Sequence, residues 1–377
     1  MDLQRVDDTD FSGGSRKRME IEVGNCSRWS ELPADLLVVI LKQLGVIEFL
    51  LFACVCKSWR FVAIALKQEF MASQSPLVFL MPTKARKYGY FYNIFDNGLY
   101  KAGLPHLAGN KCVGFTCGYL VLRDSEMTKK KANIWLVNPF TRHELKFPSP
   151  PRRYCHVIVA SLAKSDPEFV IVAFSRLHPF VQFCTSRHGN WTIIEYNKED
   201  PLVIVDVTVF KGKIYILSRN GQIGTLNLNS DHLVTYLQVR SVSCPIDNLH
   251  LVASHEELYL ARFYAKAGPI KVHRLDFVRM EWEKVKLNGE ILFLGDMKCC
   301  GLSFPTPSKA RTSQPLNRVC YLEDARILGG YRARYVAGST NEHVQVTRKD
   351  GKPKIFISSP VWYFPHLSTS VDSVDED

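Results

Sequence analysis

From residue 76 onward the chain consists of short apolar runs separated by turn clusters, and this pattern constrains the fold more than any other feature. The runs are rich in Val, Ile, Leu, Phe and Tyr, and Gly or Asn-Gly turns lie between them, whereas helical periodicity is scarce. Several short strands at such spacing are typical of an all-β sandwich, barrel or propeller. The clearest runs begin at Gly118, Asn133, His156, Phe169, Val203 and Lys213.

A weak internal repeat favours the propeller among these three architectures. Trp135, Trp191 and Trp282 each lie in or beside an expected strand, at successive spacings of 56 and 91 residues. Blades of about 40 to 50 residues are typical of four-stranded propellers. We therefore expect a β-propeller-like domain over residues 76–366. A turn leading into an aliphatic-aromatic strand also recurs, near Phe115, Phe210 and His255.

Residues 29–70 have a helical pattern instead. Apolar residues recur at helical spacing over residues 36–44, with Asp35 as the expected N-cap and Gly45 placed to end the helix. A second helical run is expected from about residue 48 to 66, and its apolar positions surround nearly the whole helix. So small a module cannot cover this surface by itself. Either a partner or the rest of the chain must cover it, and the pattern leaves both open.

Both ends of the chain are polar, and its charge is unevenly distributed. Residues 1–28 contain few large apolar groups and are expected to be disordered, as is the acidic tail over residues 367–377. Residues 71–366 carry 39 Lys/Arg against 23 Asp/Glu, a net charge of +16, whereas the whole chain carries +11. A positive body favours acidic partners, either nucleic acid or an acidic protein segment.

Apolar run lengths, the N-terminus and the cysteines give an expectation about the compartment. No apolar run reaches the roughly 18 to 20 residues of a membrane-spanning helix, and the chain opens with acids where a targeting peptide carries positive charge. The eleven cysteines are odd in number, and many lie within apolar stretches. Reduced thiols fit this pattern better than a disulfide scaffold. We expect a protein of the nucleus, the cytoplasm or both, with no membrane partner.

The motifs that commonly accompany catalysis, cofactors or metals are missing from the sequence. It contains neither GxGxxG nor GxxxxGK[ST], and no HExxH, GxSxG or paired CxxC. Asp206 and Asp276 are expected in structural or turn roles, and Cys54 and Cys56 as small core residues on a helix. We expect no enzymatic activity, no cofactor and no metal. Ordinary strand-edge or loop roles are favoured for the histidines at His143, His156, His178 and His188.

Residues 31–60 resemble an F-box, the adaptor-binding helical motif of ubiquitin-ligase substrate receptors. The matching positions include Leu32-Pro33 near the start, and the most specific piece is the VCKSWR motif over residues 55–60. The resemblance implies packing against a Skp-type adaptor, which is in turn held on a cullin scaffold. The residues implied in this contact are Leu32, Pro33, Leu36, Ile40, Leu44, Val55, Cys56 and Trp59.

The remainder resembles the plant domain-of-unknown-function-295 family, which commonly follows an F-box and is thought to be a kelch-like propeller. The combination implies the substrate-recognition subunit of an SCF-type E3 ubiquitin ligase. The F-box would bind the adaptor, and the propeller would present an unidentified protein substrate to a separately recruited ubiquitin-conjugating enzyme. The matching segments are residues 138–148, 207–228, 271–296 and 317–324.

Two other functions stay open. The positive body, with basic clusters at residues 84–87 and 129–131, fits a propeller that binds nucleic acid or acidic protein segments without a ligase role. The aromatic residues between Tyr88 and Tyr92 would suit base stacking, although aromatics at this spacing are more often strand core. A hydrolase or sensor would need acids or histidines that converge on the loops of one propeller face.

Overall fold

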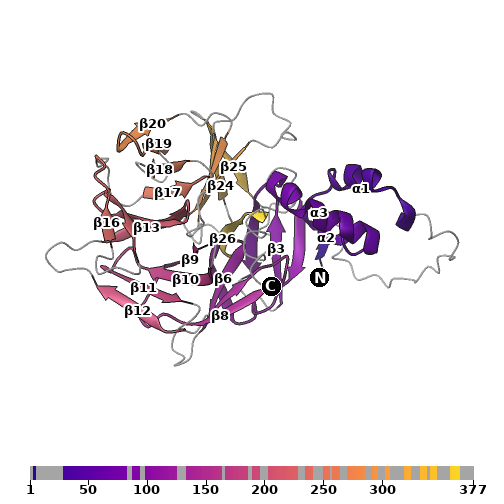
Figure 1. Cartoon of the computed structure of the whole chain (residues 1–377), viewed down its shortest axis with the longest axis horizontal. Coiled ribbons are helices and arrows are strands. Elements are labelled where there is room, and N and C mark those ends of the chain that lie inside the picture. Colours follow the sequence, from indigo (N-terminus) through magenta and orange to yellow (C-terminus); the bar gives the residue numbers. More distant parts are fainter. Residues whose placement is uncertain are drawn as a thin grey trace.

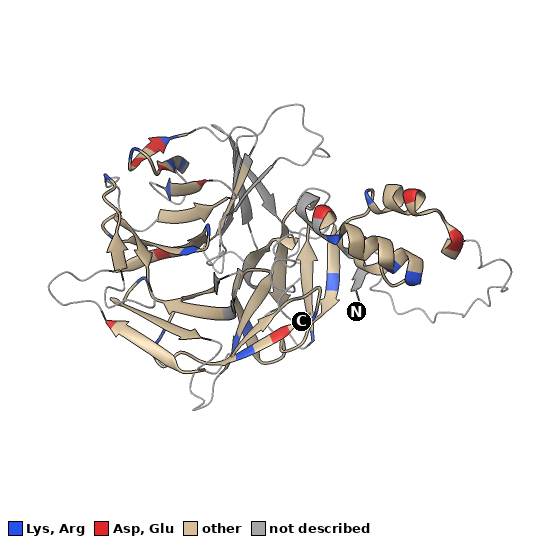
Figure 2. Cartoon of the chain, in the orientation of Figure 1, with Lys and Arg blue, Asp and Glu red and all other residues tan. Residues whose placement is uncertain are grey.

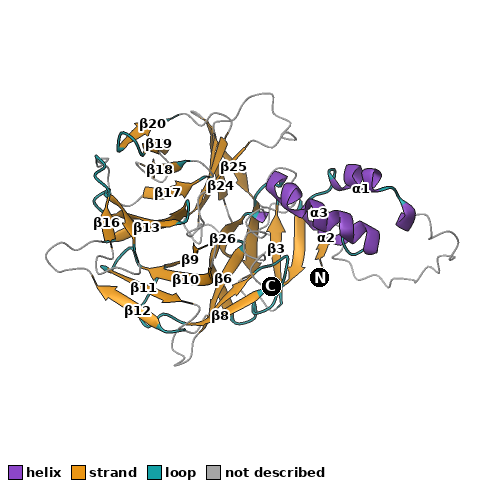
Figure 3. Ribbon diagram, viewed as in Figure 1, coloured by secondary structure: helices purple, strands orange, loops and turns teal. Residues whose placement is uncertain are grey.

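A small helical module is followed by a ring of β-sheets, and the helices gather at one side of the sheets (Figures 1 and 3). This computed structural model describes residues 3–5, 29–82, 87–93, 98–124, 133–163, 166–185, 189–195, 203–227, 234–240, 249–254, 257–263, 270–285, 290–295, 302–305, 318–323, 332–337, 340–345 and 357–365. The predicted combination of a helical module and a β-propeller is confirmed.

The helical module contains more helices than its apolar pattern predicts. The expected second run is divided into α2 and α3, because the chain turns between them and Cys56 is extended, with φ −158° and ψ 178°. Pro33, and not Asp35, is the N-cap of α1, and Gly45 begins α2 instead of ending α1. The elements are η1 (Trp29–Glu31), α1 (Ala34–Leu41), α2 (Val46–Phe52) and α3 (Lys57–Ser73).

Four of the six sheets seen among the described residues consist of four consecutive strands in chain order. Their strands pair antiparallel, as expected for the blades of a propeller. They are β5 (Asn110–Thr116), β6 (Tyr119–Asp124), β7 (Asn133–Val137) and β8 (Glu144–Pro148); β9 (His156–Ala163), β10 (Asp166–Phe174), β11 (Phe180–Thr185) and β12 (Trp191–Glu195); β13 (Ile204–Phe210), β14 (Lys213–Ser218), β15 (Ile223–Leu226) and β16 (Val234–Tyr236); and β17 (Leu249–Ala253), β18 (Leu258–Phe263), β19 (Ile270–Asp276) and β20 (Glu281–Lys284).

The other two sheets have strands out of chain order. The fifth has the order β22-β21-β23-β24-β25, and β21 runs parallel to β23. The closing sheet, with the order β1-β4-β3-β2-β26, unites strands from both ends of the chain. The bounds are β21 (Glu290–Gly295), β22 (Leu302–Pro305), β23 (Arg318–Glu323), β24 (Arg332–Ala337) and β25 (Thr340–Gln345) in the fifth sheet, and β1 (Leu3–Arg5), β2 (Leu77–Pro82), β3 (Tyr88–Tyr92), β4 (Leu99–Gly103) and β26 (Ile357–Tyr363) in the closing sheet.

The N-terminal segment over residues 1–28, which was expected to be disordered, contains one short strand. Leu3–Arg5 forms β1 and pairs antiparallel with β4, with Leu3 opposite Ala102. The rest of residues 1–28, and the acidic tail over residues 367–377, lie outside the described part of the chain. The two predictions of disorder therefore stay predictions there.

The structure explains which part of the sequence repeat is genuine. The recurring turn-and-strand segments lead into β6, β14 and β18, the second strand of three different sheets. Two of the turns have the same left-handed backbone, with φ of 45° and 84° at Cys117 and Gly118 and of 47° and 73° at Lys211 and Gly212. Positive φ at both central residues is typical of the two-residue turns that join antiparallel strands.

The tryptophan spacing is a repeat only in part. Trp191 and Trp282 lie on β12 and β20, the fourth strands of sheets two places apart, so their spacing of 91 residues spans two sheets. Trp135 instead lies on β7, a third strand. The spacing of 56 residues therefore does not measure a blade.

Apolar cores fill the spaces between consecutive sheets, and one of them extends into the helical module. The core around β26 contains Phe79, Phe91 and Trp362 together with Leu41 and Phe49 of the helices. Helix α3 ends at Ser73, and β2 begins three residues after that helix's C-cap. The module and the closing sheet therefore share one core.

Replacing Gly89 of β3 by alanine is expected to destabilise the closing sheet by about 1 to 3 kcal/mol. A Cβ atom there would overlap Cε2 of Phe79, whose ring is fully buried and cannot move away without disturbing the core. Urea denaturation measures the effect. Gly103→Ala, on β4 of the same sheet, is the control, because its Cβ would lie 3.6 Å from Cε1 of Tyr88, an ordinary van der Waals distance. A Gly89→Ala protein as stable as the wild type would contradict this packing.

Candidate functional site

The inner face of the helical module is packed against the closing sheet. In α1, Leu37 and Leu41 lie one turn apart and are both buried. The ring of Phe49 in α2 stacks on that of Phe70 in α3, with centroids 4.3 Å apart. These side chains belong to the core that continues into β2 and β26. This half of the module's apolar surface is therefore covered by the chain itself.

A polar contact also joins the module to the sheet. The hydroxyl group of Tyr100, on β4, donates a hydrogen bond of 3.3 Å to Oε1 of Glu48, on α2. Tyr100 also lines a cavity at this junction with Gly45, Val46 and Leu77. The contact fixes the orientation of α2 relative to the outer part of the closing sheet.

The outer face of the module presents apolar side chains that the described chain leaves exposed. Leu36 of α1 is 51% exposed, and Val39 lies one turn further along the same side. In α3, Phe61 is 76% exposed, and Ile64 follows it at the same spacing. Several large apolar side chains exposed on one small module make this side a candidate interaction surface. We name Leu36, Val39, Leu51, Val55, Phe61 and Ile64 the outer face.

Three residues of the VCKSWR motif bind backbone carbonyl groups and hold the module together. Nε1 of Trp59 donates to the carbonyl oxygen of Trp29 at 3.0 Å, and Oγ of Ser58 donates to that of Ser30 at 3.1 Å. Nε of Arg60 donates to the carbonyl oxygen of Ala53 at 3.2 Å. The motif therefore fixes η1 and the turn between α2 and α3 against the start of α3.

The eight predicted adaptor-binding residues divide into two groups. Pro33, Leu36 and Val55 are exposed and available to a partner. The others are half-buried, and the ring of Trp59 lies 4.5 Å from that of Phe52, centroid to centroid. Their binding roles stay predictions. The half-buried residues are Leu32, Ile40, Leu44, Cys56 and Trp59.

Four further apolar residues of the module are exposed, like Leu36 and Val55, and were not predicted from the sequence. The available signal is helical spacing, because Val39 lies three residues after Leu36, and Ile64 three residues after Phe61. It becomes informative only once the buried side of each helix is known. The four residues are Val39, Leu51, Phe61 and Ile64.

The prediction that Cys54 and Cys56 are core residues on one helix is wrong. Both lie in the turn between α2 and α3, where Cys54 is exposed and Cys56 is half-buried. The reason is the chain break that divides the expected second helix. Cys112 and Cys184, in contrast, are buried in strands, as expected of core thiols.

Cys56 is expected to react with iodoacetamide before Cys112. A hydrogen bond with the hydroxyl group of Ser58, at 3.1 Å, lowers the pKa of Cys56, whereas burial raises the pKa of Cys112 to about 12. The thiolate is the reactive form. Near neutral pH we therefore expect Cys56 to be modified in the folded protein and Cys112 to react only after unfolding. Peptide mapping by mass spectrometry measures both sites. Ser58→Ala should slow the reaction at Cys56, and equal rates at the two cysteines would contradict the assignment.

Asp206 and Asp276, the two carboxylates predicted to have structural or turn roles, bind backbone N–H groups. Asp206 is fully buried and accepts hydrogen bonds from the backbone N–H groups of Val207 and Leu251. Asp276 accepts from two backbone N–H groups in the turn that follows it. The expectation of structural and turn roles is confirmed for both.

Three of the four histidines singled out in the sequence lie among the described residues, each in different surroundings. Nδ1 of His143 is 2.7 Å from the hydroxyl oxygen of Tyr119, His156 is buried on β9, and His178 lies in an exposed turn. His188 lies outside the described residues. Among the residues that the structure describes, no group of three or more His, Cys, Asp and Glu side chains is placed to hold a metal ion.

The aromatic residues beside the first basic cluster are mainly strand core. Phe91 and Tyr92 are buried in β3, Tyr90 is half-buried, and the ring of Tyr88 is covered by Nζ of Lys101 at 4.2 Å from its centroid. They do not form an open stacking platform. Residues 83–86 and 125–132, with most of both basic clusters, lie outside the described part of the chain.

The described helices are also too short or too polar to cross a membrane.

Two family models match this chain, and together they cover most of it. The F-box domain model matches residues 29–66, which contain η1, α1, α2 and most of α3. The KIB1-4 beta-propeller model matches residues 91–343, about two thirds of the chain. The chain belongs to the KIB1-4 β-propeller family. Its helical module is an F-box, as the resemblance over residues 31–60 predicted.

Two curated relatives from Arabidopsis thaliana match over shorter stretches. "Probable F-box protein At4g22060" is 23% identical over 140 residues, which is 36% of this chain and 33% of the relative. "Putative F-box protein At4g22660" is 31% identical over 134 residues, 33% of this chain and 32% of the relative. The chain thus matches about a third of the length of each. The predicted relationship to the domain-of-unknown-function-295 family is not tested by these matches.

Proposed function

We propose that this KIB1-4 propeller protein is the substrate-recognition subunit of an SCF-type E3 ubiquitin ligase. Its F-box binds a Skp-type adaptor on a cullin scaffold, and its propeller holds a protein substrate. The observation that carries the proposal is the outer face, where Leu36 and Phe61 stay exposed although the opposite side of the same helices is buried. A relationship to the plant domain-of-unknown-function-295 family agrees with this role.

The proposed role needs no catalytic group in this chain. A substrate held near a recruited ubiquitin-conjugating enzyme reacts faster because its effective concentration is raised. A few apolar anchors in the outer face supply most of the adaptor affinity, as is usual in protein interfaces. The working compartment that we propose is the nucleus, the cytoplasm or both.

The F-box is expected to lose adaptor binding when its outer face becomes charged. Leu36→Glu places a carboxylate in the exposed contact surface and keeps a good helix former in the first turn of α1. The dissociation constant for a purified Skp-type adaptor, measured by isothermal titration calorimetry, should rise at least about tenfold. Leu177→Glu is the matched control, since Leu177 is 72% exposed but lies in a turn of the propeller.

Two results would contradict the proposal. Failure of the folded wild-type chain to bind the adaptor would remove the ligase role. Unchanged affinity in the Leu36→Glu protein would show that another surface makes the contact. The alternative, a basic propeller that binds nucleic acid or acidic segments without a ligase role, then becomes the leading function, and steep loss of binding with salt would identify it.

A further inference from the structure

The turn between β19 and β20 presents the most exposed large apolar side chain among the described residues. Val278 is 93% exposed, and the preceding Phe277 is 40% exposed. Both lie at the tip of a hairpin whose strands end in the pair Asp276 and Glu281. Adjacent exposed apolar residues at one tip form a contiguous patch, which differs from the single apolar residues scattered over most surfaces.

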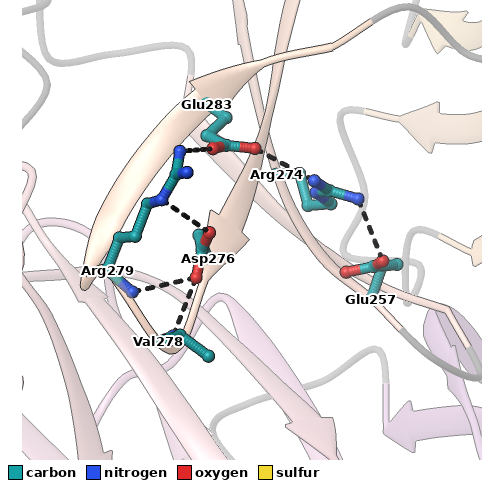
Figure 4. Close-up of polar contacts among 6 residues, drawn as sticks. All are labelled: Glu257, Arg274, Asp276, Val278, Arg279 and Glu283. Carbon is teal, nitrogen blue, oxygen red and sulfur yellow. Dashed lines mark hydrogen bonds and ion pairs between the residues drawn. The ribbon is translucent and has the colours of Figure 1, made fainter.

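Polar contacts fix the conformation of this tip (Figure 4). One oxygen of Asp276, Oδ1, accepts hydrogen bonds from the backbone N–H groups of Val278 at 2.8 Å and Arg279 at 2.9 Å. These bonds lower the pKa of Asp276, so the carboxylate that holds the turn stays charged well into the acidic range. Nη1 of Arg279 donates to Oε1 of Glu283 at 3.2 Å. A preorganised tip loses little conformational entropy when a partner binds.

The tip packs against the neighbouring sheet through aromatic contacts. The ring of Phe277 is nearly parallel to that of Phe210, at the end of β13, with centroids 5.9 Å apart and an interplanar angle of 10°. The ring of Tyr215, on β14, meets it edge-on at 6.1 Å. Phe210 and Tyr215 are themselves buried. We name Phe210, Tyr215, Phe277 and Val278 the tip patch; it joins two sheets, with a buried floor and an exposed top.

Exposed positive charge borders the tip patch on the side of the β13–β14 turn. Lys211, in the β13–β14 turn, and Lys213, at the start of β14, are exposed, and Nζ of Lys211 lies 5.2 Å from the ring centroid of Phe210. Acidic residues also occur on β19 and β20 (Figure 2). The carboxylates of Asp276 and Glu283 bind groups of the same hairpin, and Arg274 joins Glu283, at 2.9 Å, to Glu257, just before β18, at 3.3 Å.

We propose that the tip patch is the docking site for an acidic, extended protein segment that carries one large apolar side chain. The apolar side chain packs on Phe277 and Val278, and the flanking carboxylates lie near Lys211 and Lys213. This inference rests on the proposed function in one respect: the proposed function makes the bound segment part of a ubiquitination substrate. The binding itself depends on the patch alone.

The test uses the full chain and a pool of short fluorescein-labelled peptides, each with one phenylalanine or leucine among aspartates and glutamates. Fluorescence anisotropy should detect binding by the wild type, and a pool with lysines in place of the acids should not bind. Val278→Glu should weaken binding at least about tenfold, because it places a like charge in the contact. Lys213→Gln should weaken it about twofold to threefold, with a smaller effect at high salt.

Matched variants keep the result interpretable. Val278 is nearly fully exposed, so its replacement leaves the fold intact, and Leu177→Glu changes another exposed apolar position that should not affect peptide binding. Binding of the acidic pool that Val278→Glu leaves unchanged would overturn the proposal, as would absence of binding by the wild type. Tighter binding of a single-stranded oligonucleotide to the same patch would also overturn it.

Adaptor affinity, measured on the same Val278→Glu protein, separates this inference from the proposed function. Unchanged adaptor affinity with weakened peptide binding is the expected result. If the wild-type chain binds the peptide pool but does not bind the adaptor, the ligase role is contradicted and the docking site is supported.

Discussion

Replacement of Trp362 by alanine is expected to lower the free energy of unfolding by about 3 to 5 kcal/mol. Trp362 lies on β26 and is fully buried between the closing sheet and the fifth sheet. Its Nε1 donates to the carbonyl oxygen of Leu294 at 2.7 Å, and its ring meets that of Phe293 edge-on at 4.9 Å. The substitution removes this hydrogen bond and leaves a cavity at the closure of the ring.

Guanidinium denaturation followed by circular dichroism measures the change. Trp362→Phe is the matched control, because it keeps most of the ring contact and loses mainly the hydrogen bond to Leu294. The control should cost about 1 to 2 kcal/mol. If the alanine variant is destabilised no more than the phenylalanine variant, the assigned packing of Trp362 is wrong.

The second large effect is expected at Asp206. Its two carboxylate oxygens accept hydrogen bonds from the backbone N–H groups of Val207, at 2.9 Å, and Leu251, at 2.7 Å. Leu251 lies on β17, so the buried carboxylate joins two sheets. Asp206→Ala leaves two backbone donors in the interior without this acceptor, and we expect a loss of roughly 3 to 5 kcal/mol.

The control for Asp206 is another carboxylate with the same number of backbone donors. Asp276 also accepts two backbone N–H groups, but it lies in a turn near water, which can replace the lost acceptor. Thermal unfolding should therefore show a much smaller shift for Asp276→Ala than for Asp206→Ala. Equal shifts would mean that burial of the Asp206 carboxylate does not determine its contribution.

The sequence predicts elements well where a local pattern determines them. The strands after Gly118, Asn133 and Lys213 appear where the apolar runs place them, because half-buried strands need alternating or continuous apolar residues. The division between α2 and α3 was missed, because the apolar residues continue through the turn at residues 53–56. Only tertiary contacts, such as the hydrogen bond from Arg60 to Ala53, identify that break.

The candidate site was predictable only in part for a related reason. The F-box motif identifies the module. In the structure, however, the side chains of Trp59 and Ser58 donate hydrogen bonds to backbone carbonyl groups of the module itself. Which apolar residues stay exposed depends on how the module packs against β2 and β26, and those strands are distant from each other in the sequence. A one-dimensional pattern cannot separate Leu36, which is exposed, from Leu37, which is buried next to it.

The pairing of β26 with β2 has a consequence for synthesis of the protein. Leu77 pairs with Tyr363, and the core beneath the F-box includes Val361 and Phe364. A ribosome completes α1 to α3 long before it reaches residues 357–363. Until then, the nascent F-box lacks the part of its core that β26 supplies. A chain interrupted before β26 would carry the adaptor motif on an open ring. Under the proposed function, such fragments would bind the adaptor more weakly, because part of the core that supports the F-box would be missing.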